Sequence, residues 1–150
     1  MTSITFRAAA GHSGFGKSAV FLCMKNHVNI KHIKNLNNDG LRGISFYKQE
    51  LGIMQERLQE IAADNTAREV QEKVEHFQNQ FLIHGNYLDE LKHDIHGNDQ
   101  DIEAELLRTG TTVSESVATE HTRIHERYLN EERMFNDLRH EFNRLAAKWM

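Results

Sequence analysis

Histidine is the residue whose number and spacing first point to chemistry in this sequence. The 150 residues include ten histidines and one cysteine. His121 and His125 are four positions apart, a spacing that places both imidazoles on one face of a helix. His84, on a neighbouring helix, would supply a third nitrogen ligand, and water or a nearby carboxylate would complete a site for zinc or non-haem iron. These three histidines are therefore the candidate metal ligands.

The same histidines also fit a structural role, as a polar layer in a helical core. In the heptad repeat described below, His84 and His121 occupy core positions and His125 occupies a flanking position. We expect His84 to form a hydrogen bond with Tyr47 or Tyr128. Buried polar side chains of this kind are best known for setting the register of a bundle. We favour the polar layer and keep the metal site as the alternative.

Glu131 also falls on a core position of its helix. One interpretation is a buried acid, which would mark a functional site. We favour another, in which the helices separate at this point and the carboxylate reaches solvent or a basic side chain. No Ser/His/Asp arrangement can be placed, and Cys23 has no predicted helix end or cationic neighbour that would activate its thiol. We therefore predict no catalytic residue.

One formal motif lies near the start of the chain. Gly11, Gly16, Lys17 and Ser18 occupy the fixed positions of the pattern G-x-x-x-x-G-K-[ST]. The segment thus resembles the Walker A loop of nucleoside triphosphatases, which implies a lysine on the terminal phosphates and a hydroxyl on magnesium. That family also needs a buried strand before the loop and a second strand that ends in a metal-binding Asp. The sequence predicts neither strand, so we interpret the match as accidental and expect no nucleotide site.

Apolar residues recur in steps of three and four along most of the chain, the spacing of helices that pack along one seam. The first seam consists of Ile44, Tyr47, Leu51, Met54, Leu58 and Ile61. The second consists of Val70, Val74, Phe77, Phe81, His84, Leu88, Leu91 and Ile95. The third consists of Val117, His121, Ile124, Tyr128, Glu131, Phe135, Leu138, Phe142, Leu145 and Trp149. The pattern predicts an all-α fold, an antiparallel bundle of three long helices with coiled-coil-like packing.

Turn and capping residues predict where these helices begin and end. The first helix is expected over residues 40–63, and the second is expected to begin at a capping box formed by residues 66–69. Gly and Asn readily close a helix, so the cluster at residues 96–99 is expected to end the second one. A short connecting helix would follow before Gly110. A second capping box at residues 112–115 would start the third helix, which continues to the C-terminus.

The N-terminal part differs from the rest of the chain in charge. The first 38 residues contain no Asp or Glu and have a formal charge of +5, whereas the remainder has −9 and the whole chain −4. We interpret residues 1–18 as a flexible basic leader and residues 19–150 as a single helical bundle domain. For residues 19–38 we expect a fourth, shorter helix first and a β-hairpin second, with a break at residues 35–40.

These features favour a non-enzymatic helical bundle that acts through protein-protein interaction or self-association. A metal-binding bundle that uses zinc or iron is the alternative. A single cysteine forms no internal disulfide, and no segment approaches the roughly 20 apolar residues that a membrane helix needs. We therefore expect a cytoplasmic protein without a membrane span. We expect no nucleic-acid partner, because the chain beyond the leader is strongly acidic.

Overall fold

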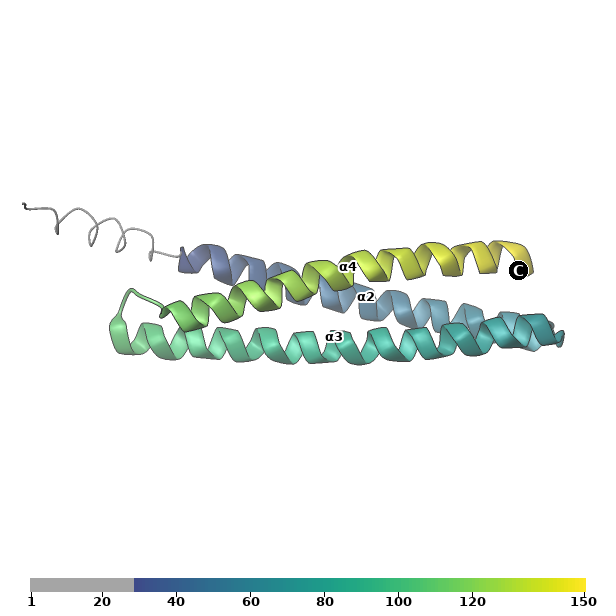
Figure 1. The fold of residues 1–150 in the computed structure, drawn as a ribbon, viewed down its shortest axis with the longest axis horizontal. Coiled ribbons are helices and arrows are strands. Elements are labelled where there is room, and N and C mark those ends of the chain that lie inside the picture. Colours follow the sequence, from purple (N-terminus) through teal and green to yellow (C-terminus); the bar gives the residue numbers. More distant parts are fainter. Residues whose placement is uncertain (1–28) are drawn as a thin grey trace, which may run out of the picture.

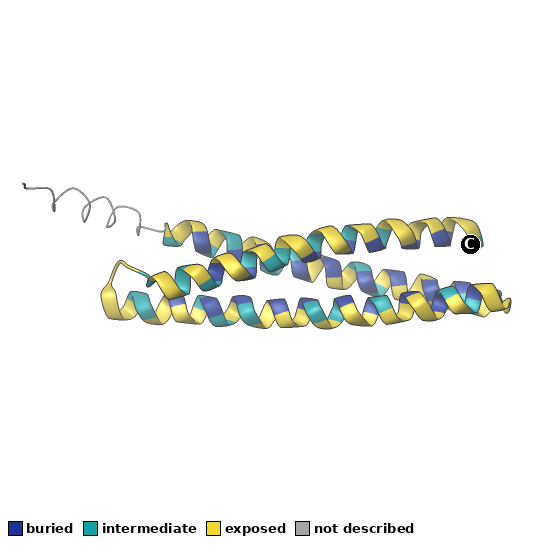
Figure 2. Cartoon of the chain, viewed as in Figure 1, coloured by how far each residue is buried: buried dark blue, intermediate teal, exposed yellow. Residues whose placement is uncertain are grey.

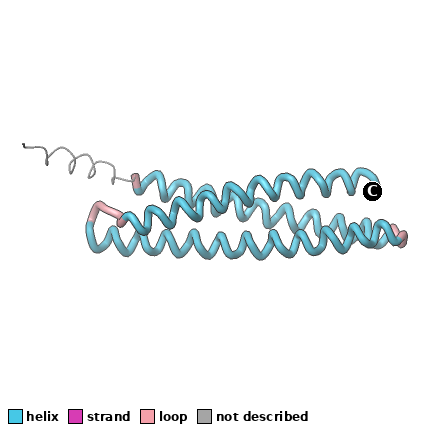
Figure 3. Tube along the Cα trace, in the orientation of Figure 1, coloured by secondary structure: helices cyan, strands magenta, loops and turns pink. Residues whose placement is uncertain are grey.

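The computed structural model describes residues 29–150, which form three long helices packed side by side (Figure 1). Helix α2 spans Ile30–Asp64, α3 spans Arg68–Thr109 and α4 spans Glu115–Trp149. Helices α2 and α4 run in the same direction and α3 runs against both (Figure 1). Apart from short connections, the described residues are helical and include no strand (Figure 3). The predicted all-α antiparallel bundle is confirmed.

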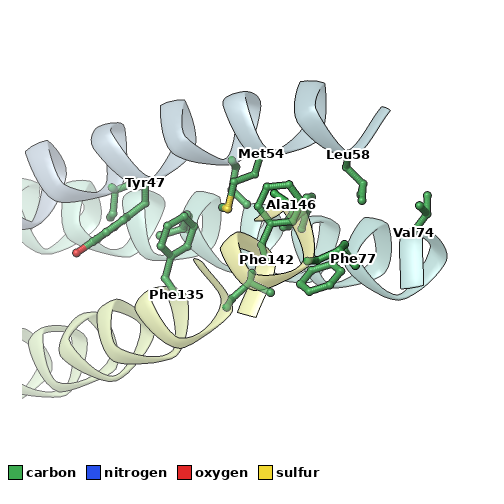
Figure 4. Close-up of a cluster of buried hydrophobic side chains, with 14 of the residues drawn as sticks. Tyr47, Met54, Leu58, Val74, Phe77, Phe135, Phe142 and Ala146 are labelled. Carbon is green, nitrogen blue, oxygen red and sulfur yellow. The ribbon is translucent and has the colours of Figure 1, made fainter. Parts of the chain in front are cut away.

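Each helix buries one stripe of side chains and exposes the rest of its surface (Figure 2). Every predicted seam residue of α2 and α3 is buried. In α4 the predicted stripe is also buried, except that Val117, Tyr128 and Trp149 are only half-buried. Aromatic rings from all three helices fill the centre of the core, where Tyr47 packs on Phe135 and Phe77 on Phe142 (Figure 4). Burial of this stripe explains why long helices with many polar residues are stable.

Helix α2 begins ten residues earlier than predicted. The Asn29 side chain caps it by accepting a hydrogen bond from the His32 backbone N–H at 3.3 Å. Asn37 and Gly40 are buried on the stripe of α2, so the predicted break at residues 35–40 is wrong. Residues 30–38 are therefore the first part of α2 and form neither a separate fourth helix nor a β-hairpin. The packing of this segment outweighs the weak helix propensity of Asn and Gly.

The predicted leader, its phosphate-loop match and Cys23 lie outside the described residues. The same holds for residues 19–28, the first part of the segment expected to form a fourth helix or a β-hairpin.

Helix α3 continues without interruption through the Gly and Asn residues that were expected to end it. Asn98 is buried on the stripe and donates a hydrogen bond to the Val117 carbonyl oxygen at 3.2 Å. Ile102, one turn further, is fully buried. The predicted end and the short helix after it are therefore one continuous helix. It closes at Gly110, whose φ of +83° is the left-handed conformation that favours glycine.

Both predicted capping boxes place the helix start near the right residue but assign the wrong cap. The N-cap of α3 is Ala67, which has no side-chain oxygen and forms no capping hydrogen bond. The Gln71 side chain connects α3 to the end of α2, because its Nε2 donates to the Ala62 and Asn65 carbonyl oxygens. The N-cap of α4 is Ser114, two residues after the predicted Thr112. Its hydroxyl accepts a hydrogen bond from the Val117 backbone N–H at 3.4 Å.

Candidate functional site

Five polar side chains are buried in the apolar stripe, and they form two separate layers. The first, here called the His84 layer, consists of His84 and Glu131. The second, here called the His121 layer, consists of Asn37, Asn98 and His121. Because a buried polar group without a partner is costly, the partners within each layer decide what that layer can do.

In the His84 layer, an imidazole on α3 meets a carboxylate on α4. His84 Nδ1 lies 2.5 Å from Glu131 Oε1, and the two residues are 8% and 1% exposed. In the tautomer with its proton on Nδ1, His84 donates this hydrogen bond to a carboxylate oxygen of Glu131. The polar-layer interpretation thus identified the right residue but the wrong partner, because neither Tyr47 nor Tyr128 bonds to His84. Glu131 is buried, so the favoured opening of the helices toward solvent is wrong. Its one partner at ion-pair distance within residues 29–150 is His84, not a Lys or Arg side chain.

Tyr47 lies beside this layer, at the level that the sequence predicted, but its hydroxyl is used elsewhere. It donates a hydrogen bond to Glu132 Oε1 at 2.7 Å, on the edge of the bundle. The Tyr47 ring packs on Phe135, which also contacts the edge of the His84 ring. Burial and the neighbouring Glu132 carboxylate both raise the pKa of Tyr47, since each disfavours the phenolate. Tyr47 therefore stays protonated and serves as a donor.

The His121 layer links all three helices by hydrogen bonds. His121 Nδ1 lies 3.0 Å from Asn37 Oδ1, and Asn37 Nδ2 donates to Asn98 Oδ1 at 3.3 Å and to Asp99 Oδ1 at 2.7 Å. The pKa of His121 is lowered, mainly by burial and further by the nearby His125 and His32, while Asp99 acts in the opposite direction. Burial disfavours the charged imidazolium, so this layer is built for a neutral His121.

The structure brings two of the three candidate metal ligands together. The rings of His121 and His125 stack with centroids 5.9 Å apart and an angle of 11° between planes. His84 bonds to Glu131, which lies ten residues beyond His121 on α4 and thus about 15 Å along its axis. Within residues 29–150, no group of three or more His, Cys, Asp or Glu side chains is arranged to hold a metal ion. A zinc or iron site built from all three histidines therefore stays a prediction.

A groove between α3 and α4 opens over the His84 layer. Its volume is about 550 Å³, and its surroundings include both residues of that layer. Ile83 on α3 and Met134 on α4 line it and are 51% and 40% exposed. The seam pattern did not predict this groove, because Ile83 and Met134 lie outside the seam. The sequence does contain a signal for the groove: Ile83 and Met134 are apolar residues on helix faces that a simple bundle exposes to solvent and leaves polar.

Arg127 organises the charged side chains next to this groove. Its guanidinium donates to Asp94 Oδ2 at 2.5 Å and to Glu90 Oε1 at 2.7 Å, and its Nε donates to the Tyr87 hydroxyl at 3.1 Å. The guanidinium carbon also lies 5.3 Å from the centroid of the Tyr87 ring, within reach of a cation–π interaction. Arg127 is therefore fully engaged, and both Tyr87 and Glu90 are held where they line the groove.

The geometry defines a class of protein, an all-α bundle of three antiparallel helices whose core contains two polar layers. No family model, curated protein or solved structure that was compared with this chain matches it. Helices α2, α3 and α4 all lack an apolar stretch long enough to cross a membrane.

Proposed function

We propose that this protein is a non-enzymatic helical bundle that acts through protein-protein interaction or self-association. The observation that carries the proposal is the groove between α3 and α4, where Ile83 and Met134 expose apolar surface from two different helices. Scattered apolar residues on a surface need no explanation, but apolar residues that line a common groove are typical of binding sites.

The two polar layers support this proposal, because they give the bundle one register. A slip of one helix along another would separate His84 from Glu131 and His121 from Asn37, which would leave buried polar groups without partners. The exposed side chains therefore keep fixed relative positions. A surface that is already organised loses less conformational entropy when it binds.

Association is tested with the full chain and with a variant that changes the groove alone. We expect wild-type protein to form a complex, either with itself in sedimentation velocity or with a cellular protein after cross-linking. Ile83→Glu combined with Met134→Glu should abolish that complex. Leu107→Glu is the matched control, because Leu107 is highly exposed but does not line the groove. A wild-type protein that remains monomeric and yields no complex sensitive to the groove variant contradicts the proposal.

A metal-binding bundle is the second candidate, supported by the stacked pair of His121 and His125. Two imidazoles four residues apart on one helix can share a metal ion, with solvent in the remaining coordination positions. Zinc and non-haem iron are the metals that suit such nitrogen ligands.

A further inference from the structure

We propose that the groove over the His84 layer binds an amphipathic helix of a partner protein, and that one arginine of this helix reaches Glu131 and His84. The inference rests on the interaction function proposed above and specifies the chemistry of the partner. It follows from the free hydrogen-bonding atoms of residues that line the groove, from the charge around it, and from the apolar residues that line it from two helices.

Two residues that line the groove each have a polar atom without a hydrogen-bond partner in the described part of the chain. Glu131 uses Oε1 for His84, and His84 uses Nδ1 for Glu131. Within residues 29–150, neither Glu131 Oε2 nor His84 Nε2 has a hydrogen bond, and the one fully enclosed side-chain atom without a partner is Trp149 Nε1. Glu131 Oε2 and His84 Nε2 are therefore not fully enclosed, although the two residues are only 1% and 8% exposed. Both residues line the groove, which is where these atoms can be reached.

The two free atoms are both acceptors. In the His84 tautomer with its proton on Nδ1, Nε2 is an acceptor, and a carboxylate oxygen accepts as well. A guanidinium group has five N–H donors in a planar fork, so it can bond to both atoms at once, which a single point donor does less well. The floor of the groove is therefore complementary to the head of an arginine side chain.

The electrostatic environment also favours a cation. Glu90 lines the groove, and the nearest guanidinium, that of Arg127, is already paired with Glu90 and Asp94. Residues 29–150 contain 22 acidic and 15 basic side chains, a formal charge of −7. A partner with a positive charge is attracted to this surface, and one with a negative charge is repelled.

The apolar sides of the groove favour a helix over a small cation. Ile83 comes from α3 and Met134 from α4, and both line the groove and are about half exposed. A helix that lies between α3 and α4 would place apolar side chains against Ile83 and Met134, one turn before and after its arginine. The groove volume of about 550 Å³ falls within the range of about 300–1,000 Å³ that is typical of binding pockets. The arrangement extends the three-helix bundle by a fourth helix.

Binding of two synthetic peptides to the full chain tests this proposal. Each peptide is an amphipathic model helix of about 20 residues, roughly 30 Å long, with leucine on its apolar face. One has a single central arginine on that face, and the other has citrulline, which keeps the shape of arginine without its charge. We expect the arginine peptide to bind about tenfold more tightly or better, because only its guanidinium forms charge-assisted hydrogen bonds to the Glu131 carboxylate.

Four variants identify where the peptide binds. Glu131→Gln keeps the shape of the side chain and should reduce binding of the arginine peptide to that of the citrulline peptide. Glu126→Gln removes an equal charge from an exposed site of α4 and should change neither. Ile83→Ser should weaken binding of both peptides, whereas Leu82→Ser should not, because Leu82 faces the groove between α2 and α3. Ile83 and Leu82 are both exposed, so these two variants do not depend on tolerance of a buried change.

Several results would overturn the inference: equal binding of the two peptides, no binding of either, or equal effects of Ile83→Ser and Leu82→Ser. Free arginine that binds as tightly as the peptide would indicate a small-cation site and would also overturn helix docking. A complex of the wild-type chain that Ile83→Glu combined with Met134→Glu abolishes, together with equal binding of the arginine and citrulline peptides, would leave the proposed interaction function intact while the arginine contact is rejected. Dimerisation that Glu131→Gln abolishes, without binding of either peptide, would overturn the inference and identify a second copy of this chain as the occupant of the groove.

Discussion

Gly43 on α2 and Tyr128 on α4 meet so closely that the tyrosine hydroxyl occupies the space that a side chain at residue 43 would need. A Cβ atom built on Gly43 would lie 2.0 Å from Tyr128 Oη, far inside van der Waals contact. Tyr128 is half-buried, and this burial raises its pKa. The contact shows why glycine stands inside a long helix, where it lowers stability by about 1 kcal/mol relative to alanine. Because Gly43 has no side chain, α2 and α4 can approach each other closely at this point.

Replacement of Gly43 should therefore destabilise the bundle. We expect Gly43→Ala to lower the free energy of unfolding by about 1–2 kcal/mol, because overpacking outweighs the gain in helix propensity. Gly52→Ala is the matched control in the same helix, since a Cβ there meets no heavy atom within 4 Å. That variant should raise stability by about 0.5–1 kcal/mol. Urea unfolding followed by circular dichroism measures both, and equal stabilities for the two variants would contradict the steric argument.

The His84–Glu131 pair should behave as a coupled unit. We expect His84→Leu or Glu131→Leu alone to cost about 3–5 kcal/mol, because each leaves one buried polar group without its partner. The double variant should cost less than the sum of the two single ones, since an apolar pair needs no partner. A double-mutant cycle by urea unfolding gives the coupling energy. Additive single effects would show that the contact contributes no such coupling.

The free energy of unfolding of the bundle should fall when the pH drops below about 6.5, the ordinary pKa of a histidine side chain. The pKa of His121 is lowered in the folded state, whereas an unfolded histidine titrates near 6.5. The unfolded chain therefore binds a proton first, and stability that is complete above about pH 6.5 decreases as the pH falls below it.

His121→Gln tests this linkage because it keeps a donor for Asn37 but does not titrate. Unfolding free energies measured from about pH 7.5 to about pH 5 should decline less steeply in this variant than in the wild type. His32 and His125, which lie near His121, are present in both proteins, so the comparison changes His121 alone. Identical slopes would remove His121 as the source of the pH dependence.

Metal content separates the two candidate functions. We expect zinc or iron well below one atom per chain in protein purified without a histidine tag, because His84 and His121 already bond within separate layers. Elemental analysis of the wild type and of His121→Ala measures it. A stoichiometric metal that disappears in His121→Ala would establish the metal-binding bundle instead.

The positions of the core residues could be predicted from the sequence, but some helix ends could not. The three-four spacing gave the buried stripes correctly, because each helix must turn its apolar face toward the others. Local signals failed at residues 35–40 and at Gly97, where Gly and Asn normally interrupt a helix. There the packing of Asn37 and Asn98, which form hydrogen bonds between helices, outweighs local propensity. The groove at Ile83 and Met134 was missed because no periodicity describes it.

The sequence by itself determined that the chain forms three amphipathic helices and that His84 and His121 face inward, whereas the burial of Glu131 was not the interpretation that we favoured. The heptad spacing defines how each helix is rotated about its own axis, and that rotation decides which side chains point to the core. Only the tertiary structure decided that His84 bonds to Glu131 and His121 to Asn37. Those pairs depend on the axial offset between helices, which the packing of the whole core sets and which no repeat within one helix contains.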